Sequence, residues 1–281
     1  MAEADPNIYL QGTRYRVPGL ESELLGLARS DNRGDKPPVL FVHGAFSRGK
    51  IWEFEFLDYF ASAGFPSFSF DLRGRKSSPF ALIQPGLDEY AKDIEQAIQA
   101  LSEPPIVVAH SMGGFVAQKL IGKVPMRALV LMGTVPPLGV ATSNMMMAMQ
   151  YPFLWMNTAL FAVNPAMGDL TAASGALFSA LVEKERARTF LRSSVSESPR
   201  ALLELQMPAT IASARSKDVP ALVIGGAEDK LIPIDEQERA AAYHNAPFIQ
   251  IDQLGHAMMA DARWKVCAQA IENWLREDVI G

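Results

Sequence analysis

The sequence predicts an α/β fold, in which a mostly parallel central sheet is flanked by helices and carries an inserted all-helical segment. Two observations support this prediction. Short apolar runs, typical of strands buried on both faces of a parallel sheet, alternate with stretches of helical periodicity near both ends of the chain. This alternation fails over residues 134–208, which contain no convincing strand pattern. We therefore divide the 281 residues into a core, 1–133 and 209–281, and a helical cap, 134–208.

The core is expected to begin with an antiparallel pair of strands. Two strand-like runs, at 9–17 and 24–29, are separated by Pro18-Gly19, which is a turn signal. Alternating strands and helices of a parallel sheet should follow. In chain order they are strand 38–42, helix 50–63, strand 65–70, helix 87–101, strand 106–108, helix 115–121, strand 127–132, strand 221–224, helix 235–243, strand 248–251 and helix 264–275.

Composition restricts the class of partner. The net charge of −5 argues against nucleic acid or an anionic membrane surface as the main partner. A single cysteine, Cys267, excludes an internal disulfide framework, fits a reducing compartment and is expected to be buried. Residues 1–6 carry acids where a secretory signal has a basic region, and no apolar run approaches the length of about 18 residues that a membrane span needs. We expect a cytoplasmic protein without integral membrane segments, and no pattern indicates its oligomeric state.

A candidate nucleophile lies where the apolar run at 106–108 ends abruptly in the turn Ala109-His110-Ser111-Met112-Gly113-Gly114. Ser111 follows this run, and a stretch of helix-forming composition follows Ser111. A strand, a sharp turn and a helix in this order are the setting of a serine nucleophile in a G-x-S-x-G motif. Gly113 provides the clearance such a turn needs, while Ala109 stands where the motif has its first glycine. The alternative is a strand-to-helix turn with an incidental serine.

A serine hydroxyl needs a base to take its proton, and a third group must orient that base. Of the four histidines, His256 follows the last predicted strand, at the carboxyl edge where open α/β sheets place their sites. The strand at 221–224 leads through a glycine-rich turn to two acids. We choose Asp229 because its shorter side chain suits a fixed, buried partner for imidazole, and Glu228 is the alternative.

A tetrahedral intermediate would also need two hydrogen-bond donors for its oxyanion. The first expected donor is the backbone N–H of Met112, directly after the serine and at a helix N-terminus. The second is the backbone N–H of Ala45, in the loop after the strand at 38–42. The histidines lack metal-ligand spacing with cysteines or carboxylates, so we expect neither a metal nor a cofactor.

The predicted cap is rich in methionine and aromatic residues, which suit an adaptable apolar pocket. The alternative is that these side chains only pack the cap onto the core. The candidate pocket residues are Phe46, Met145, Met149, Phe153, Trp155 and Met258. Their apolar character indicates an apolar small molecule as the substrate.

The motifs taken together resemble those of the α/β-hydrolase superfamily, in its serine esterase and lipase-like branch with a helical cap. The matching segments are His43-Gly44-Ala45-Phe46, Asp71-Leu72-Arg73-Gly74, Ala109-His110-Ser111-Met112-Gly113-Gly114, Gly226-Ala227-Glu228-Asp229 and Gly255-His256. This sequence departs from the pattern at Ala109 and at Lys76, where many relatives have glycine. Dehalogenase and epoxide-hydrolase relatives use aspartate at the position of Ser111, which disfavours both activities.

The resemblance implies a serine hydrolase that cleaves a carboxylic ester, or else a thioester or lactone, with an apolar moiety. Ser111, His256 and Asp229 would act through an acyl-enzyme. Two other functions stay open on the same fold. One is C–C bond hydrolysis or another cofactor-independent reaction, and the other is a ligand receptor without catalytic activity.

Overall fold

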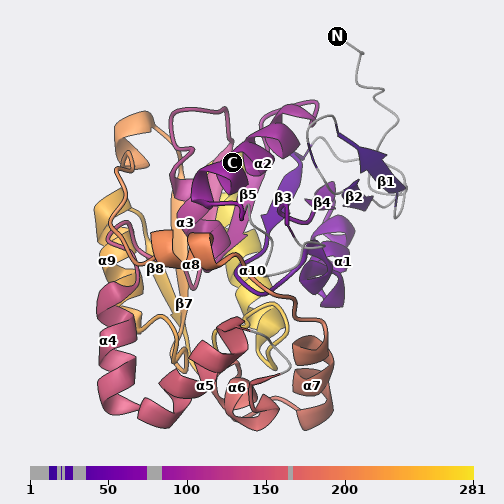
Figure 1. The fold of residues 1–281 in the computed structure, drawn as a ribbon. Helices are drawn as coiled ribbons and strands as arrows, with labels where there is room; N and C mark the ends of the chain where they lie inside the picture. The colour runs from indigo at the N-terminus through magenta and orange to yellow at the C-terminus, as the bar shows by residue number, and fades with distance from the viewer. Residues whose placement is uncertain (1–12, 18–19, 21–22, 28–35, 75–83, 164–166) are drawn as a thin grey trace.

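The computed structural model describes residues 13–17, 20, 23–27, 36–74, 84–163 and 167–281. In this part of the chain eight strands form one sheet, in the order β1-β2-β4-β3-β5-β6-β7-β8 (Figure 1). From β4 to β8 neighbouring strands are parallel, whereas β1 pairs antiparallel with β2, and β2 with β4. The predicted α/β class is therefore confirmed. The strands are β1 (Thr13–Arg16), β2 (Glu23–Leu27), β3 (Val39–Val42), β4 (Ser67–Ser69), β5 (Ile106–His110), β6 (Ala128–Met132), β7 (Ala221–Gly226) and β8 (Phe248–Ile251).

Successive side chains of the parallel strands enter two different buried clusters, one on each face of the sheet. In β3, Leu40 and Val42 belong to one cluster, and Val39 and Phe41 belong to the other. Helices α2 (Leu87–Gln99), α3 (Met112–Gln118) and α9 (Ile234–His244) contribute to the first cluster, and α1 (Phe56–Ser62) and α10 (Trp264–Trp274) to the second. Burial on both faces is the reason that these strands appear in the sequence as unbroken apolar runs.

Several predicted boundaries differ from the structure. The helix expected at 50–63 is a 3₁₀ helix, Gly49–Phe54, followed by α1, because the backbone leaves the helical region at Glu55 (φ −155°). The strand expected at 65–70 has only three residues in the ladder. The Pro18-Gly19 turn and Lys76 lie outside the described residues. Two short helices, Arg215–Lys217 and the π-helix Leu275–Ile280, complete the described elements.

Five α-helices follow one another between β6 and the short 3₁₀ helix Arg215–Lys217 that precedes β7, and no strand occurs among the described residues of this stretch. They are α4 (Ala141–Gln150), α5 (Pro152–Val163), α6 (Leu170–Leu177), α7 (Lys184–Arg192) and α8 (Pro199–Glu204). Helices α4 to α7 gather at one end of the molecule, the bottom as drawn in Figure 1, while α8 returns toward the middle. We refer to α4–α8 as the helical insertion, and its treatment as a separate cap, 134–208, stays a prediction.

Candidate active site

Ser111 occupies a strained turn between β5 and α3. Its backbone has φ 53° and ψ −121°, a region that residues with a Cβ rarely adopt. Its N–H donates to the carbonyl of Met132 at the end of the neighbouring strand (3.0 Å). Gly113 passes so close to β3 that a Cβ there would lie 2.3 Å from the carbonyl oxygen of His43. The turn therefore requires glycine at 113, and it forms with alanine at 109.

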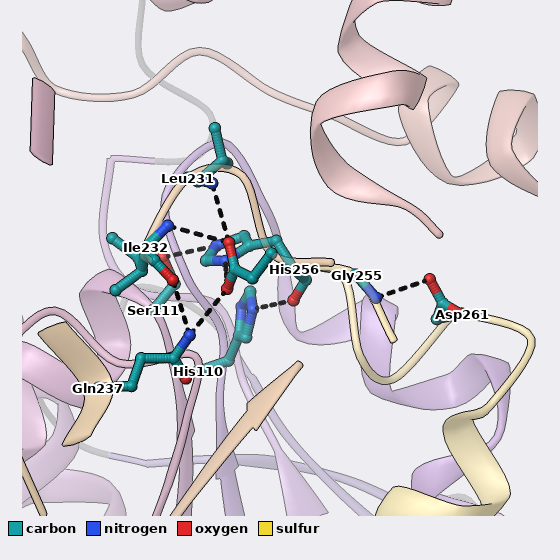
Figure 2. Close-up of polar contacts among 9 residues, drawn as sticks. His110, Ser111, Leu231, Ile232, Gln237, Gly255, His256 and Asp261 are labelled. Atoms are coloured by element: carbon teal, nitrogen blue, oxygen red, sulfur yellow. Dashed lines mark hydrogen bonds and ion pairs between the residues drawn. The ribbon is translucent and has the colours of Figure 1, made fainter. Parts of the chain in front are cut away.

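Ser111, His256 and Asp229 form a continuous hydrogen-bonded chain. The Nε2 of His256 lies 3.0 Å from the Ser111 hydroxyl oxygen, and its Nδ1 lies 2.7 Å from Oδ2 of Asp229. His256, in the loop after β8, thus connects Ser111 after β5 with Asp229 after β7, and Figure 2 shows His256 and Ser111 close together. In this arrangement Nδ1–H donates to Asp229, which leaves the lone pair of Nε2 to accept the serine proton.

The carboxylate of Asp229 is held by more than the imidazole. Its Oδ1 accepts the backbone N–H groups of Leu231 and Ile232, each at 2.9 Å (Figure 2). The side-chain amide of Gln237 in α9 donates to Oδ2 (3.3 Å). The alternative acid, Glu228, accepts the N–H of Ala180 in the helical insertion instead. Asp229 is thus the acid that meets the imidazole, and Gln237 is a supporting residue that sequence reasoning missed.

Gly133 leaves the space that the carboxylate and the imidazole occupy. A Cβ at this position would lie 3.3 Å from both Oδ2 of Asp229 and Nδ1 of His256. The residue also has φ +51°, which favours glycine. This position ends β6, where the sequence carries no carboxylate, and the structure indicates why a small residue stands there.

Two further buried side chains hold the loop of His256 and were not predicted. His110 donates through Nε2–H to the backbone carbonyl of His256 (2.9 Å), and the two rings lie 4.7 Å apart (Figure 2). Asp261 accepts the N–H of Gly255 (3.2 Å) and both the N–H and the hydroxyl of Ser179 in the helical insertion (2.8 Å each). His110 belongs to the motif around Ser111, but nothing in that motif indicates its contact with residue 256, and Asp261 stands in no recognisable pattern.

His110 is neutral in this site. Burial, followed by the electrostatic effect of the neighbouring His256, lowers the pKa of His110 well below its usual value. Its Nδ1 has no hydrogen-bond partner among the described residues, so a proton there would find no acceptor. The side chain therefore serves as a fixed donor and does not titrate near neutral pH.

The loop after β3 is held in place by the helical insertion. Phe46, the residue after Ala45, has φ 58°, which is unusual for an aromatic residue. Its carbonyl accepts the N–H of Val195 (2.9 Å), and its N–H donates to the buried carboxylate of Glu197 (3.3 Å). The segment between α7 and α8 thus holds Phe46 at both of its backbone groups.

A cavity of about 300 Å³ lies over Ser111 and His256, between the core and the helical insertion. Of the residues expected at the oxyanion, Ala45 lines this cavity, and Met112 is the first residue of α3. Among the described residues that line it, none is Asp, Glu, Lys or Arg. Apolar side chains of the insertion form much of the wall, including Met147, Trp155, Ala173, Ala176, Leu177, Phe190, Leu202 and Leu205.

The expected pocket needs correction at four positions. Phe46 and Trp155 line the cavity, but Met145, Met149 and Phe153 are exposed and do not. Met147 lines it instead of Met145 and Met149, because two residues along a helix turn a side chain through about 200°, toward the opposite face. The fourth, Met258, is fully buried in the cluster on the face of the sheet that α1 and α10 cover, and it does not line the cavity.

The described part of the chain offers neither a cluster of metal ligands nor a helix suited to span a membrane. It contains no group of three or more His, Cys, Asp or Glu side chains that could hold a metal ion. None of its helices has both the length and the apolar character that crossing a membrane requires.

Comparison with known proteins places the chain in a family. The profile of the Alpha/beta hydrolase family matches residues 39–270. A non-heme chloroperoxidase, CPO-A1 of Kitasatospora aureofaciens, is 24% identical over 230 residues, which cover 74% of this chain and 80% of that protein.

Solved structures share the fold at low sequence identity. A putative non-heme bromoperoxidase, BpoC of Mycobacterium tuberculosis, has a TM-score of 0.71 at 22% identity, over 93% of this chain and 97% of that one. The esterase EaEST of Exiguobacterium antarcticum has a TM-score of 0.71 at 18% identity, over 95% of this chain and all of that one. The family profile covers most of the sequence and the same fold recurs over nearly the whole length, so this chain belongs to the alpha/beta hydrolase family.

Proposed function

We propose that this protein is a serine hydrolase that cleaves carboxylic esters with an uncharged, apolar moiety. The observation that carries the proposal is the hydrogen-bonded chain from the Ser111 hydroxyl through His256 to Asp229, with steps of 3.0 and 2.7 Å. A neutral hydroxyl is a weak nucleophile, and this chain supplies a base and an orienting carboxylate within hydrogen-bond reach. The cavity beside it supports an uncharged substrate, since its described lining carries no Asp, Glu, Lys or Arg.

In the proposed reaction, the Ser111 oxygen attacks the ester carbonyl while His256 Nε2 takes the hydroxyl proton. The backbone N–H groups of Met112 and Ala45 stabilise the oxyanion, as proposed from their positions beside the serine. His256 then returns the proton to the leaving alcohol, and an acyl-serine remains. Water, deprotonated by His256, attacks this acyl group and releases the acid. Asp229 holds the imidazole in orientation and stabilises its charged form throughout.

The test is a comparison of Ser111→Ala with the unchanged protein on short-chain nitrophenyl esters. We expect the variant to lose turnover by a factor of about 10³ or more, because the nucleophile acts together with its base as a unit. A fluorophosphonate should label Ser111 in the unchanged protein, which peptide mass spectrometry reads out. Full activity of Ser111→Ala would remove this mechanism.

The names of the haloperoxidase relatives favour a second candidate function, peroxide-dependent halogenation. In the same site, hydrogen peroxide in place of water could attack an acyl-Ser111, releasing a peracid and the free serine. The peracid would then oxidise bromide to hypobromous acid and revert to the carboxylic acid. Bromination of phenol red in acetate, peroxide and bromide measures this activity, and Ser111→Ala should abolish it together with ester hydrolysis.

A further inference from the structure

The helical insertion contains a long stretch with almost no charge. The 49 residues from 134 to 182 include a single charged side chain, Asp169. This carboxylate caps α6 by accepting the N–H groups of Thr171 and Ala172. A protein surface in water normally carries charged residues of both signs, so the exposed part of this stretch, where Asp169 is the single charged residue, requires another explanation.

Large apolar side chains of this stretch are exposed on α4, on α5 and at the turn between them, which we call the α4–α5 hairpin (residues 141–160). Their exposed fractions run from 39% to 78%. The hairpin packs as a pair of neighbouring helices at the end of the molecule away from β1 and β2 (Figure 1). The side chains are Met145, Met146, Met149, Tyr151, Phe153, Trp155, Met156 and Leu160. Exposed large apolar side chains gathered on one pair of neighbouring helices indicate an interaction site.

The hairpin is exposed on more than one side. Phe153 and Trp155 lie about 200° apart around α5, yet both are exposed. A helix with apolar residues all round is normally covered on all sides. A flat protein partner would cover one side of a projecting hairpin, whereas fluid lipid can surround several. The geometry thus favours lipid over a second copy of this chain.

The charge and length of the hairpin indicate which lipid surface it fits. Anionic bilayers attract clusters of Lys and Arg, which residues 141–160 lack, and the whole chain carries −5. Exposed Trp and Tyr side chains suit the headgroup region of a bilayer. The 12 residues of α5 extend about 18 Å, well short of the roughly 30 Å hydrocarbon core, so the helix can enter the surface but not cross it.

The hairpin is also continuous with the cavity over Ser111. Trp155 is exposed on the hairpin and forms part of the cavity wall. Met147 of α4 lines the cavity on the opposite side of its helix from Met145 and Met149. A partner surface that contacts the exposed side of the hairpin would therefore also touch Trp155, which forms part of the cavity wall.

We propose that the α4–α5 hairpin docks this protein onto the surface of a phospholipid bilayer of zero net charge. The docking is driven by burial of the exposed Met, Phe, Trp and Tyr side chains at the boundary between headgroups and acyl chains. It goes beyond ester hydrolysis and does not depend on it, because the exposed apolar side chains of the hairpin, Trp155 apart, lie outside the cavity.

Co-sedimentation of the full chain with phosphatidylcholine vesicles tests the proposal, and Ser111→Ala is used so that no lipid is cleaved. We expect binding that is the same at low salt and at about 0.5 M NaCl, since screening affects charged contacts and not apolar burial. Adding Met149→Lys and Phe153→Lys should lower the bound fraction about tenfold or more. The matched control adds Val266→Lys, an exposed apolar position on α10, and should bind as before.

Tryptophan fluorescence provides the second measurement. Trp155 is exposed, whereas Trp52 is fully buried and Trp274 nearly so. Brominated phosphatidylcholine should therefore quench emission on binding, and the Met149→Lys, Phe153→Lys protein should lose this quenching. The same double substitution on an otherwise unchanged chain should leave hydrolysis of soluble nitrophenyl esters unaltered, since neither residue lines the cavity.

Three results would overturn the proposal. The first is the absence of binding to phosphatidylcholine vesicles. The second is binding that requires phosphatidylglycerol and is lost in salt, which would assign the contact to charged residues elsewhere. The third is a dimer in sedimentation velocity that dissociates on Met149→Lys, which would assign the hairpin to a second copy of this chain. Each result is read on a chain without the Ser111 hydroxyl, so failure here is separate from failure of the proposed hydrolysis.

Discussion

At the scale of single residues, the candidate triad depends on how its acid is held. The carboxylate of Asp229 receives two backbone N–H groups and the Gln237 amide in addition to the imidazole. These donors fix the direction of the carboxylate. An imidazole that faces a fixed carboxylate keeps its Nε2 lone pair toward the serine. Several residues that hold Asp229 therefore determine the orientation of His256 together.

The contribution of Gln237 can be measured with Gln237→Met, which keeps the volume and removes the amide. We expect kcat for ester hydrolysis to fall about tenfold with KM little changed, because the loss misdirects the base without altering the cavity. Steady-state kinetics on nitrophenyl esters provide the measurement. Glu238→Met, an exposed neighbour on the same helix, is the matched control and should keep full activity. An unchanged kcat in Gln237→Met would show that the backbone N–H groups suffice.

At the scale of elements, the segment between α7 and α8 connects the helical insertion to the loop that carries Ala45. Phe46 adopts φ 58°, a conformation that costs about 1–2 kcal/mol for a residue with a Cβ. Hydrogen bonds from Val195 and to Glu197 offset this cost. Glu197 also accepts the hydroxyl of Tyr90 on α2 (2.6 Å), which ties the segment to the core. The insertion thus sets the conformation of the proposed oxyanion loop.

Glu197→Gln tests this connection. The amide keeps the size of the side chain but cannot accept from Phe46, Tyr90 and Ser198 at once, as the carboxylate does. We expect kcat to fall about tenfold, KM to change little, and affinity for a boronic acid that mimics the tetrahedral state to fall in parallel.

The control for this variant is Glu204→Gln on α8. Glu204 accepts the N–H of Leu87 and pairs with Arg200, so it holds the same region of the insertion to the core without touching Phe46. We expect this control to lower thermal stability and to leave kcat unchanged. Equal losses of kcat in both variants would contradict a specific role for Glu197.

At the scale of the whole molecule, a buried polar network connects α3, the helix after the nucleophile, with α9 and with the backbone at Ala214. His244 of α9 donates through Nε2–H to Oε1 of Gln118 on α3 (2.9 Å), and its Nδ1 accepts the N–H of Ala214 (3.1 Å). Gln118 in turn donates to Gly114, Thr134 and Val135 (3.0 to 3.1 Å). Both nitrogens of His244 are committed to a neutral ring, because a proton on Nδ1 would face the N–H of Ala214.

This network makes the fold sensitive to acid. Burial lowers the pKa of His244 from 6.5 to about 4. His244 therefore binds a proton more readily in the unfolded chain than in the folded one. Its contribution to the free energy of unfolding is complete above pH 6.5 and declines as the pH falls toward 4. The loss from this residue is at most about 3 kcal/mol. Urea unfolding between pH 7 and 4 should show the decline, and His244→Asn should reduce its slope. An identical slope in the variant would assign acid sensitivity to other groups.

Local sequence patterns predicted some residues of the candidate site and not others. The turn at Ser111, the last strand before His256 and the glycine-rich turn before Asp229 follow from local patterns, and the structure brings these three side chains together. Glu228 and Asp229 were separable only by side-chain length. No local pattern indicated the contacts of Gln237 with Asp229, His110 with residue 256, Asp261 with Ser179 or Glu197 with Phe46, because these pairs lie 8 to 151 residues apart in the chain.

The sequence by itself determined the order of strands and helices, the tight turn at Ser111 and the uncharged character of residues 134–168, because these depend on neighbouring residues. Tertiary structure decided which face of each helix meets the cavity. Met147 faces inward and Met149 outward, although both are methionines in one uncharged helix. Composition cannot separate them, since the choice depends on how α4 packs against distant elements, and α4 has no charged side chain to mark its solvent side.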